Sequence, residues 1–270
     1  MRADIITVTY NNTESTLRCF RSLREHTDDY NLIWVDNGSS RESRNAVMDE
    51  VKMHPIHKTA WMQTNLGFIK GVNTGLEMLE QWGFPSPYVV FLNNDVVVTK
   101  GWLDRMIGIM EKDRTVFAVG PITSECTSWQ SYLHAREVVS VFDIPDGFQQ
   151  MNLEQRAAKL DYCFGNLYRM VSMLAFFCTV FRREVFIKLG FLDESFGVGL
   201  GDDDDFCYRM WQADMRCAVS LGTFVQHEHR STFKTLYTEE QYKDMKNDRF
   251  ARFREKHGVD PRVYEVRGLQ

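Results

Sequence analysis

The chain has 270 residues, of which 44% are hydrophobic and 26% are charged. This composition excludes a disordered chain, which has fewer apolar residues, and a membrane bundle, which has fewer charges. The net charge of −5 gives no basic footprint and so disfavours a dedicated nucleic-acid binder. No run approaches roughly 18 apolar residues and no apolar leader follows Met1, so we expect a cytoplasmic protein without a transmembrane segment.

Six cysteines are spread along the chain, and no two of them form a C-x-x-C pair. In a chain of this size, such cysteines are typical of reduced thiols, several of them in the core, rather than of a zinc ribbon. They are Cys19, Cys126, Cys163, Cys178, Cys207 and Cys217.

The first 120 residues alternate short apolar runs with helical periodicities. Strands are predicted over residues 4–10, 32–35, 59–63, 88–92 and 116–119. Helices are predicted over residues 17–26, 39–52, 68–81 and 102–112. This order predicts an α/β fold with a largely parallel sheet and helices on both faces.

Regular periodicity is lost between residues 121 and 172, and we interpret this stretch as a variable lobe of the same domain. A strand over 176–181 and helices over 182–189 and 238–257 are predicted to follow. Between these two helices, a further helix through residues 209–211 is predicted after an acidic run at 202–205. We expect one domain over residues 1–237, with halves 1–120 and 121–237. The remaining residues, 238–270, are expected to form a helical extension that packs on the domain or makes a homodimer contact.

Polar loops follow three of the predicted strands, at 10–12, 36–38 and 93–95. In parallel sheets, ligands bind beyond the carboxyl ends of the strands, so these loops are where chemistry is expected. Asp36 can accept hydrogen bonds from a base or a ribose, and Gly67 precedes a helix whose N-terminus can face a phosphate. Ordinary turns are the alternative, because Asn, Asp and Gly dominate turns.

Asp95 stands at the tip of a buried strand, in the sequence N-N-D. One carboxylate, together with diphosphate oxygens and water, can complete an octahedral Mg²⁺ or Mn²⁺ shell, and a β-turn cap is the alternative. His227 and His229 follow a short apolar strand, and a neutral imidazole suits Mn²⁺. Arg230 and Lys234 can grip a phosphate or can be solvated surface charges.

Four consecutive aspartates occupy residues 202–205. Like charges packed together raise one another's pKa values and oppose folding unless a cation or a helix N-terminus compensates them. The run precedes a predicted helix, and Asp205 stands four residues before Arg209, which favours an acidic helix cap. The alternative is that one of these aspartates is a general base that takes a proton from an acceptor hydroxyl.

Together these segments resemble the family 2 glycosyltransferases, whose fold is termed GT-A. The resemblance runs from residue 5 to residue 233 and rests on the order and spacing of short motifs that are weak individually. The motifs are VTYN at 8–11, VDNGS at 35–39, NLGF at 65–68, NTG at 73–75, LNND at 92–95, GFLDESF at 190–196, GDDDDFCYR at 201–209, VQH at 225–227 and STF at 231–233. The implied fold is a single-domain, Rossmann-like, mainly parallel mixed sheet flanked by helices.

The resemblance implies a role for each matching position. Asp95 matches the last acid of the family's metal-binding D-x-D motif, whose first acid is absent here, and His227 matches a histidine that ligates the same metal. Asp203 matches the catalytic base, and Asp202 replaces the usual Glu before it. Asp204 and Asp205 are its further acidic neighbours. The implied nucleotide-sugar site comprises Thr9, Tyr10, Asn11, Asp36, Asn65, Gly67, Lys70, Asn73, Asn93, Asn94 and Arg230.

The implied reaction moves a sugar from a uridine, thymidine or guanosine diphosphate to an acceptor hydroxyl. A divalent cation, Mn²⁺ or Mg²⁺, at Asp95 would neutralise the leaving diphosphate, and Asp203 would deprotonate an acceptor that attacks from the opposite face. The anomeric configuration would therefore be inverted. The acceptor could be a glycan, a lipid-linked sugar, a protein or a modified nucleobase. We expect residues 121–172, with Trp129, Tyr132 and His134, to shape its site.

Three other interpretations remain open at the level of the sequence. A nucleotidyltransferase also uses an α/β sheet, a metal and a nucleotide, but it usually has a Gly-rich basic loop where this chain has YNNT at 10–13. A non-catalytic nucleotide-sugar-binding module would have no need of Asp95, Asp203 and His227. A metal-dependent nuclease is disfavoured, because four adjacent acids cannot all face one metal and no basic groove is evident.

Overall fold

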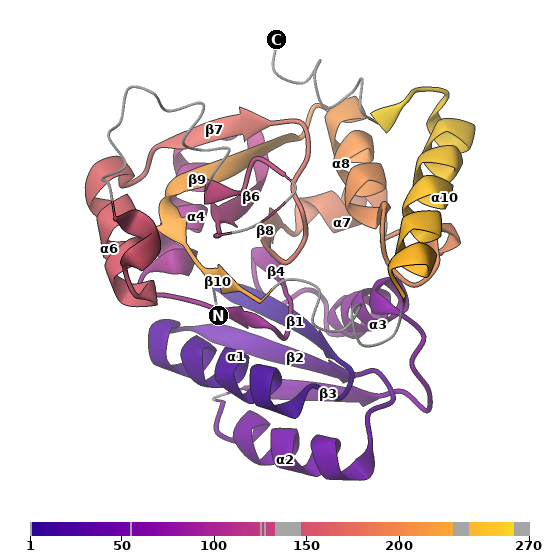
Figure 1. Ribbon diagram of the computed structural model, residues 1–270, viewed down its shortest axis with the longest axis horizontal. Coiled ribbons are helices and arrows are strands. Elements are labelled where there is room, and N and C mark those ends of the chain that lie inside the picture. The colour runs from indigo at the N-terminus through magenta and orange to yellow at the C-terminus, as the bar shows by residue number, and fades with distance from the viewer. Residues whose placement is uncertain are drawn as a thin grey trace.

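An eight-stranded sheet forms the centre of the molecule, with the strand order β3-β2-β1-β4-β8-β6-β9-β7 (Figure 1). A separate two-stranded ribbon pairs β10 with β5. The computed structural model describes residues 2–54, 56–124, 126, 128–132, 147–228 and 238–261.

The elements have the following bounds. The strands are β1 (Ala3–Thr9), β2 (Tyr30–Asp36), β3 (His57–Trp61), β4 (Tyr88–Leu92), β5 (Val96–Val97), β6 (Val116–Ile122), β7 (Tyr168–Val171), β8 (Cys178–Arg182), β9 (Arg216–Phe224) and β10 (Gln226–His227). The α-helices are α1 (Thr13–His26), α2 (Arg41–Val51), α3 (Phe68–Gln81), α4 (Trp102–Lys112), α6 (Leu153–Phe164), α7 (Glu184–Leu189), α8 (Asp202–Gln212) and α10 (Glu239–His257). Two short 3₁₀ helices are η1 (Phe148–Gln150) and η2 (Glu194–Phe196).

The sheet is mixed but mainly parallel. β1 pairs parallel with β2 and β4, β2 with β3, and β6 with β9. β8 lies antiparallel between β4 and β6, and β7 is antiparallel to β9 at the edge. β1, β2, β3, β4 and β6 therefore all end at the same edge of the sheet, and the predicted mainly parallel α/β sheet is confirmed.

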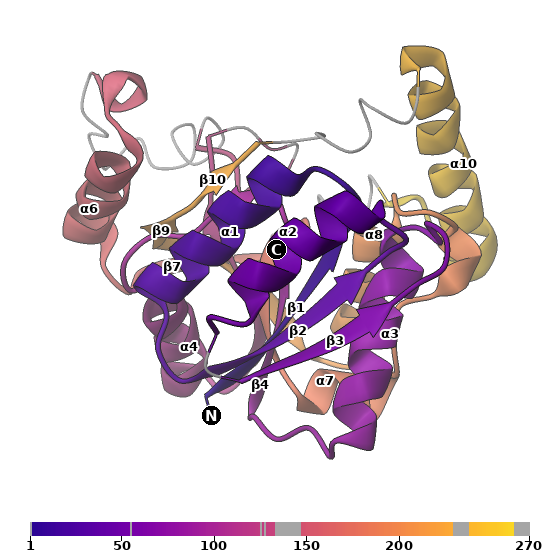
Figure 2. The same ribbon diagram turned by 90° about the horizontal axis from the view of Figure 1, so that it is seen from below.

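Two apolar layers cover the two faces of the sheet, because successive side chains of a strand point in opposite directions. Ile5 of β1 belongs to the layer that contains Phe20 of α1. Its neighbour Ile6 belongs to the layer that contains Leu76 of α3. Figure 2 shows α1 and α2 together on one side of β1 and β2, with α3 on the other side. The central strands β1, β2 and β4 are thus buried on both faces, as strands without polar alternation predict.

The region between residues 121 and 172 differs from the sequence-based interpretation. We expected no regular element there, but this stretch contains α6 and β7. Asn152 and Gln155 form a complete capping box at the start of α6, and Ala157, Leu160 and Phe164 are its buried residues. The capping pattern and the spacing of these apolar residues are visible in the sequence, so the helix was predictable and the interpretation was wrong at this point.

Several element boundaries also shift: α1 begins at Thr13 rather than at residue 17, and β3 covers His57–Trp61 rather than 59–63. The predicted strand over 176–181 begins only at Cys178 and extends to Arg182, which pairs with Tyr88. The following helix consequently begins at Glu184. The last helix begins at Glu239, because Thr238 is its N-cap and forms a capping box with Gln241.

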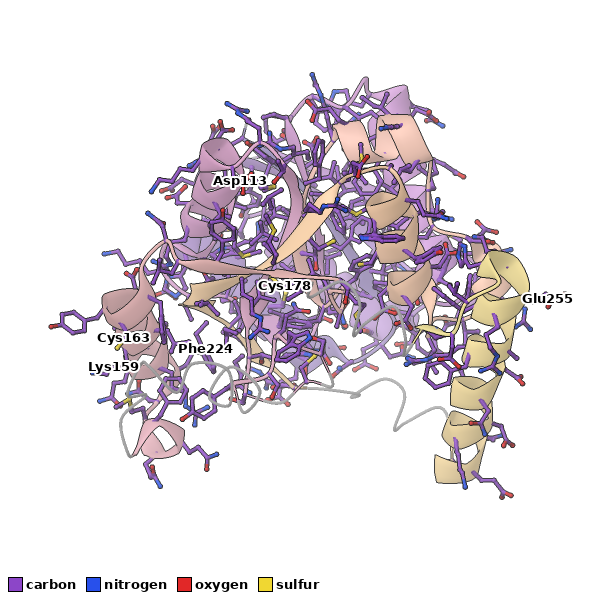
Figure 3. All side chains as sticks on the ribbon, turned by 90° about the horizontal axis from the view of Figure 1, so that it is seen from above. Asp113, Lys159, Cys163, Cys178, Phe224 and Glu255 are labelled. Carbon is purple, nitrogen blue, oxygen red and sulfur yellow. The ribbon has the colours of Figure 1, made fainter. Side chains whose placement is uncertain are left out.

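The cysteines are free, as expected, and four of them are buried: Cys19, Cys178, Cys207 and Cys217. Figure 3 shows Cys178 near the middle of the molecule, with α6 (Lys159 and Cys163) and α10 (Glu255) on opposite sides. No helix within the described ranges is both long enough and apolar enough to cross a membrane.

Candidate active site

The carboxyl ends of β1, β2 and β4 meet at one edge of the sheet, and candidate residues stand at or just beyond each of them. Thr9 and Asp36 are register partners at the ends of β1 and β2. Asn93 follows directly after β4, which pairs parallel with β1. The sheet therefore brings the three polar loops together, which is the arrangement in which open α/β sheets bind ligands.

The loops after β1 and β2 are bonded to each other through Asn11. Its backbone N–H donates to Ser39 Oγ at 2.8 Å, and its Oδ1 accepts from the Ser40 N–H at 2.9 Å. The hydroxyl of the buried Thr9 accepts from Trp34 Nε1 at 2.8 Å. Thr9 and Asn11 therefore hold the edge in shape, and Tyr10 lies half-buried between them.

Asp36 is only 1% exposed and has one compensating cation. Arg44 Nε donates to its Oδ2 at 2.7 Å, while its buried Oδ1 has no hydrogen-bond partner among the described residues. The Arg44 guanidinium also lies 4.8 Å from the ring centroid of Trp61, which is the register partner of Asp36 on β3 and is 47% exposed. A buried polar atom without a partner is costly, so Asp36 Oδ1 is an acceptor suited to a ligand N–H or O–H.

Asn37 organises the turn before α3, although sequence reasoning gave it no role. Its Nδ2 donates to Asn65 Oδ1 and to the Gly67 carbonyl, both at 2.9 Å. Its Oδ1 accepts from the Leu66 N–H at 3.0 Å. Asn65 Oδ1 accepts in addition from the Gly67 N–H at 2.9 Å. The Asn in the VDNGS motif was the only sequence signal of this clamp, and it ties β2 to the turn.

Gly67 joins the two halves of the chain. It has φ +87°, and a Cβ at this position would lie 2.6 Å from Val198 Cα. The next amide, of Phe68, donates to the Val198 carbonyl at 2.8 Å. Only glycine allows this approach. The segment that leads into α8 is thus fixed against the start of α3. The first amide of α3 is used in this contact with Val198.

Asn73 makes a second connection between the same halves. Its Nδ2 donates to the Leu192 carbonyl at 2.9 Å, and its Oδ1 accepts from the Leu192 N–H at 3.1 Å. Nδ2 also lies 3.2 Å from Glu194 Oε1, and Lys70 Nζ lies 3.6 Å from Glu194 Oε2. Asn73 therefore supports the site by fixing the turn before α8, and its amide is fully used in doing so.

Asp95 and His227 lie side by side. β5 and β10 form the antiparallel ribbon, in which Val96 is the register partner of His227. Asp95 Oδ1 lies 3.3 Å from His227 Nε2, and both side chains are largely buried. The His227 ring is stacked on Phe177, with centroids 4.7 Å apart. A carboxylate and an imidazole this close, with the ring held rigidly, fit a shared Mn²⁺ or a similar ion.

The two asparagines before Asp95 have different surroundings. The Asn93 N–H donates to the Phe177 carbonyl at 2.8 Å, and its buried Oδ1 has no hydrogen-bond partner in the described part of the chain. Asn94 Nδ2 donates to Thr16 Oγ1 on α1 at 2.8 Å. The Asn94 side chain therefore anchors the loop, whereas Asn93 keeps a free acceptor.

The aspartate run forms the first turn of α8 rather than preceding the helix, and its four members differ in exposure. Asp202, Asp204 and Asp205 are buried, whereas Asp203 is half-buried. Asp202 Oδ1 accepts from the Leu200 N–H at 2.9 Å, so this side chain caps the turn before the helix. Asp203 is therefore the member of the run that a substrate can approach most directly.

The other two aspartates are compensated by cations. Asp205 Oδ2 accepts from Arg209 Nε at 2.9 Å, which is the expected i,i+4 pair. Its Oδ1 lies 2.7 Å from both Lys256 Nζ and His257 Nε2 of α10. Asp204 Oδ2 lies 3.7 Å from Arg249 Nε, also on α10. Nothing in the sequence predicted that the last helix packs on this run.

Burial and mutual repulsion make two of the aspartates weaker acids. Burial, with a smaller contribution from the charge of Asp203, raises the pKa of Asp202 to about 7. Burial also raises the pKa of Asp203, and the positive charge of Arg249 opposes this shift. A carboxylate with a raised pKa is a stronger base, so both shifts suit proton abstraction near neutral pH.

Some predicted residues lie elsewhere. Arg230, His229, Lys234 and His134 fall outside the described residues. Tyr132 is buried and stacked on Phe148, with ring centroids 4.3 Å apart, so it belongs to the core. The described part of the chain contains no cluster of three or more His, Cys, Asp or Glu side chains that could enclose a metal alone.

A comparison with family models gives one match, to the family described as Glycosyl transferase family 2, over residues 4–190. Among curated proteins, the pre-mycofactocin glycosyltransferase of Mycobacterium tuberculosis is 26% identical over 230 residues. The alignment covers 83% of this chain but only 42% of that protein, so the chain spans less than half the length of its relative.

Two solved structures share the fold. A mannosyltransferase from Pyrobaculum calidifontis, in complex with GDP-Man and Mn²⁺, has a TM-score of 0.64 and 15% identity, covering 98% of this chain and 67% of that one. GalNAc-T7, with UDP, GalNAc and Mn²⁺, has a TM-score of 0.59 and 16% identity, covering 84% of this chain and 44% of that one. These similarities confirm the GT-A fold.

Proposed function

Because the chain belongs to glycosyl transferase family 2, we propose that it transfers a sugar from a nucleoside-diphosphate sugar to an acceptor hydroxyl, with inversion and with a divalent cation. One observation carries the proposal. The aspartate run at the start of α8 leaves Asp203 half-buried, while its neighbours are engaged in capping or ion pairs.

The donor nucleotide is proposed to lie at the edge formed by β1, β2 and β3. Asp36 Oδ1, which has no hydrogen-bond partner within the described ranges, can accept an N–H of the base or a ribose hydroxyl. The exposed ring of Trp61 stands beside it, and aromatic rings stack well on nucleobases. UDP, GDP or dTDP sugars all meet these requirements, and the two similar solved structures hold UDP and GDP-Man.

Asp95 and His227 are proposed to hold the cation, with oxygen atoms of the donor diphosphate completing its coordination. The 3.3 Å separation of Asp95 Oδ1 and His227 Nε2 supports this pairing. The two similar solved structures contain Mn²⁺. When bound, such an ion neutralises the charge that develops on the leaving diphosphate. Asn93 stands two residues before Asp95, and its Oδ1 accepts no hydrogen bond from the residues that the structure describes.

Asp203 is proposed to be the general base. As the acceptor oxygen forms a bond to the anomeric carbon, its O–H bond breaks and the proton moves to the Asp203 carboxylate. The bond from the anomeric carbon to the diphosphate oxygen breaks, and the nucleoside diphosphate leaves with that electron pair. Attack opposite the leaving group inverts the anomeric configuration.

The two halves of the chain are proposed to divide these tasks. Residues 1–120 supply the nucleotide edge and Asp95, and residues 121–237 supply Asp203, His227 and the acceptor site. The contacts of Gly67 with Val198 and of Asn73 with Leu192 support this division, because they fix one half against the other. The acceptor is proposed to be a hydroxyl compound, without a further assignment of its class.

A thermal-shift screen of nucleotide sugars with Mn²⁺ tests the donor proposal. A donor that binds the folded chain raises its melting temperature by mass action, and we expect one base and one sugar to stand out. The matched variant is Asp36→Asn, which keeps the size of the side chain but loses the carboxylate and should lose the shift.

Product analysis then tests the reaction. Release of a nucleoside diphosphate together with a glycosylated acceptor supports the proposal. Release of pyrophosphate would instead identify a nucleotidyltransferase. Donor binding without turnover on any hydroxyl acceptor would identify a non-catalytic binding module.

A further inference from the structure

The C-terminal helix α10 packs on the first turn of α8, where the proposed base lies. Phe253 of α10 is only 1% exposed, and its ring centroid is 5.4 Å from that of Tyr208 on α8. The His257 ring is 4.6 Å from the same tyrosine. Figure 1 shows α10 running beside α8. The apolar contacts fix the position of α10, so its charged residues lie at defined places along α8.

Arg249 lies over the N-cap of α8. A Cβ built on Gly201, the N-cap residue, would be 3.0 Å from Arg249 Cβ. From this position the Arg249 side chain extends to Asp204, with 3.7 Å between Nε and Oδ2. Arg249 therefore spans the turn that contains the aspartate run. Asp203 lies, in the sequence, between the two residues that Arg249 contacts, Gly201 and Asp204.

The charges that face Asp203 come from two helices. On α8 this is the carboxylate of Asp202, next to the neutral thiol of Cys207, whose pKa burial raises well above its ordinary value. From α10, Arg249 contributes the positive charge that lowers the pKa of both Asp202 and Asp203. Lys256 and His257, further along α10, are bonded to Asp205. Arg249 is thus the described cation whose charge acts on Asp203.

Resting on the proposed function, we propose that Arg249 is a positioning residue for the Asp203 base and that α10 is a part of the catalytic centre. The guanidinium lies beside Asp204 and offsets the negative charge of the run. Asp203 is thereby kept ionised and available to accept the proton of the acceptor hydroxyl. Removal of this charge should make Asp203 hold a proton at a higher pH.

The test compares three variants with the wild-type chain. Arg249→Gln removes the charge, Arg249→Lys retains it, and Arg252→Gln is the matched control. Arg252 is exposed on the same helix and donates to the Ser195 carbonyl, away from the run. Two readouts are needed: the pH dependence of kcat, and an NMR titration of ¹³C-labelled aspartate carboxyl groups in the substrate-free protein.

We expect Arg249→Gln to move the acid limb of kcat and the Asp203 titration upward by about one pH unit. The donor Kd, measured by calorimetry, should change less than twofold. Arg249→Lys, which retains the positive charge, should cause a much smaller shift, and Arg252→Gln should cause none. An unchanged Asp203 titration in Arg249→Gln, or an equal shift in Arg252→Gln, would overturn the proposal.

Asp204→Asn gives an independent check if Arg249→Gln does not fold. It replaces the Asp204 carboxylate by a neutral amide of nearly the same shape and leaves Arg249 in place. The loss of a neighbouring negative charge should lower the pH at which Asp203 titrates. An upward shift or no shift would contradict the proposal. Absence of sugar transfer in the wild-type chain would refute the proposed function. The NMR titration needs no turnover, so it would still test whether Arg249 controls the pKa of Asp203.

Discussion

His227 Nε2 lies 3.3 Å from Asp95 Oδ1, although the two residues belong to opposite halves of the chain. The β5–β10 ribbon aligns them, and the Glu228 N–H donates to the Asp95 carbonyl at 3.1 Å. The Glu228 carboxylate is bonded to Ser15 and Arg18 of α1. The ribbon is therefore attached to the body of the domain immediately beside the pair.

We predict that Asp95→Asn and His227→Ala each weaken Mn²⁺ binding by more than about tenfold, because each would remove one of the proposed protein ligands. Electron paramagnetic resonance of free Mn²⁺ measures this without turnover. EDTA should also stop sugar transfer, and excess Mn²⁺ should restore it. His57→Gln is the control, since His57 begins β3 at the opposite edge of the sheet. Equal Mn²⁺ binding by all three variants would remove Asp95 and His227 from the metal site.

We predict that Asp203→Asn lowers kcat by about 10²- to 10⁴-fold, because an amide cannot accept the acceptor proton. Donor binding, measured by calorimetry, should survive, since the proposed nucleotide contacts, such as Asp36, lie on the other half of the chain. Asp49→Asn is the charge control, because Asp49 is an exposed residue of α2. Full activity of Asp203→Asn would show that the base lies elsewhere.

Gly67→Ala is predicted to destabilise the fold by about 2–4 kcal/mol, from backbone strain and overpacking. The residue has φ +87° and ψ 171°, and the new Cβ would lie 2.6 Å from Val198 Cα. Gly83→Ala is the matched control, with φ +76° but no atom within 4 Å of the new Cβ, and should cost about 1 kcal/mol. Urea unfolding measures both. Equal losses would mean that the contact with Val198 adds nothing.

His54 is predicted to make stability depend on pH. Burial of its ring lowers the pKa of His54 to about 4, and Tyr30 bonds its Nδ1 at 2.5 Å. The folded pKa is below the unfolded value near 6.5, so as the pH falls from 6.5 to 4 the unfolded chain gains a proton that the folded chain excludes. The free energy of unfolding should therefore fall over this range, by about 2 kcal/mol between pH 7 and pH 5.

His54→Gln should remove that part of the pH dependence, although it also lowers stability at every pH. Urea unfolding at pH 7 and pH 5 measures the difference between the two slopes. His26→Gln, at the end of α1, should leave the slope unchanged. The prediction fails if wild-type and His54→Gln chains lose the same free energy between these two pH values.

Much of this protein was determined by its sequence alone. Helical periodicity specified the bounds of α3 and α4 to the residue, because the spacing of the apolar residues that a helix buries is a local property of the chain. The strand–helix alternation specified a mainly parallel sheet, and such a sheet brings Asp36 and Asp95 to one edge. The helix α6 was also readable from its capping box, and it was missed because the surrounding residues lack a regular period.

Other features were decided only by the tertiary structure. No local pattern states which of four adjacent aspartates remains approachable, because that depends on which cations pack against the run. The compensating side chains belong to α10, far along the chain. Arg249 pairs with Asp204, and Asp205 is bonded to Lys256 and His257. The pairing of Asp95 with His227 depends likewise on the β5–β10 ribbon. Charge compensation acts through space, so these choices appear only once distant segments of the chain have been packed together.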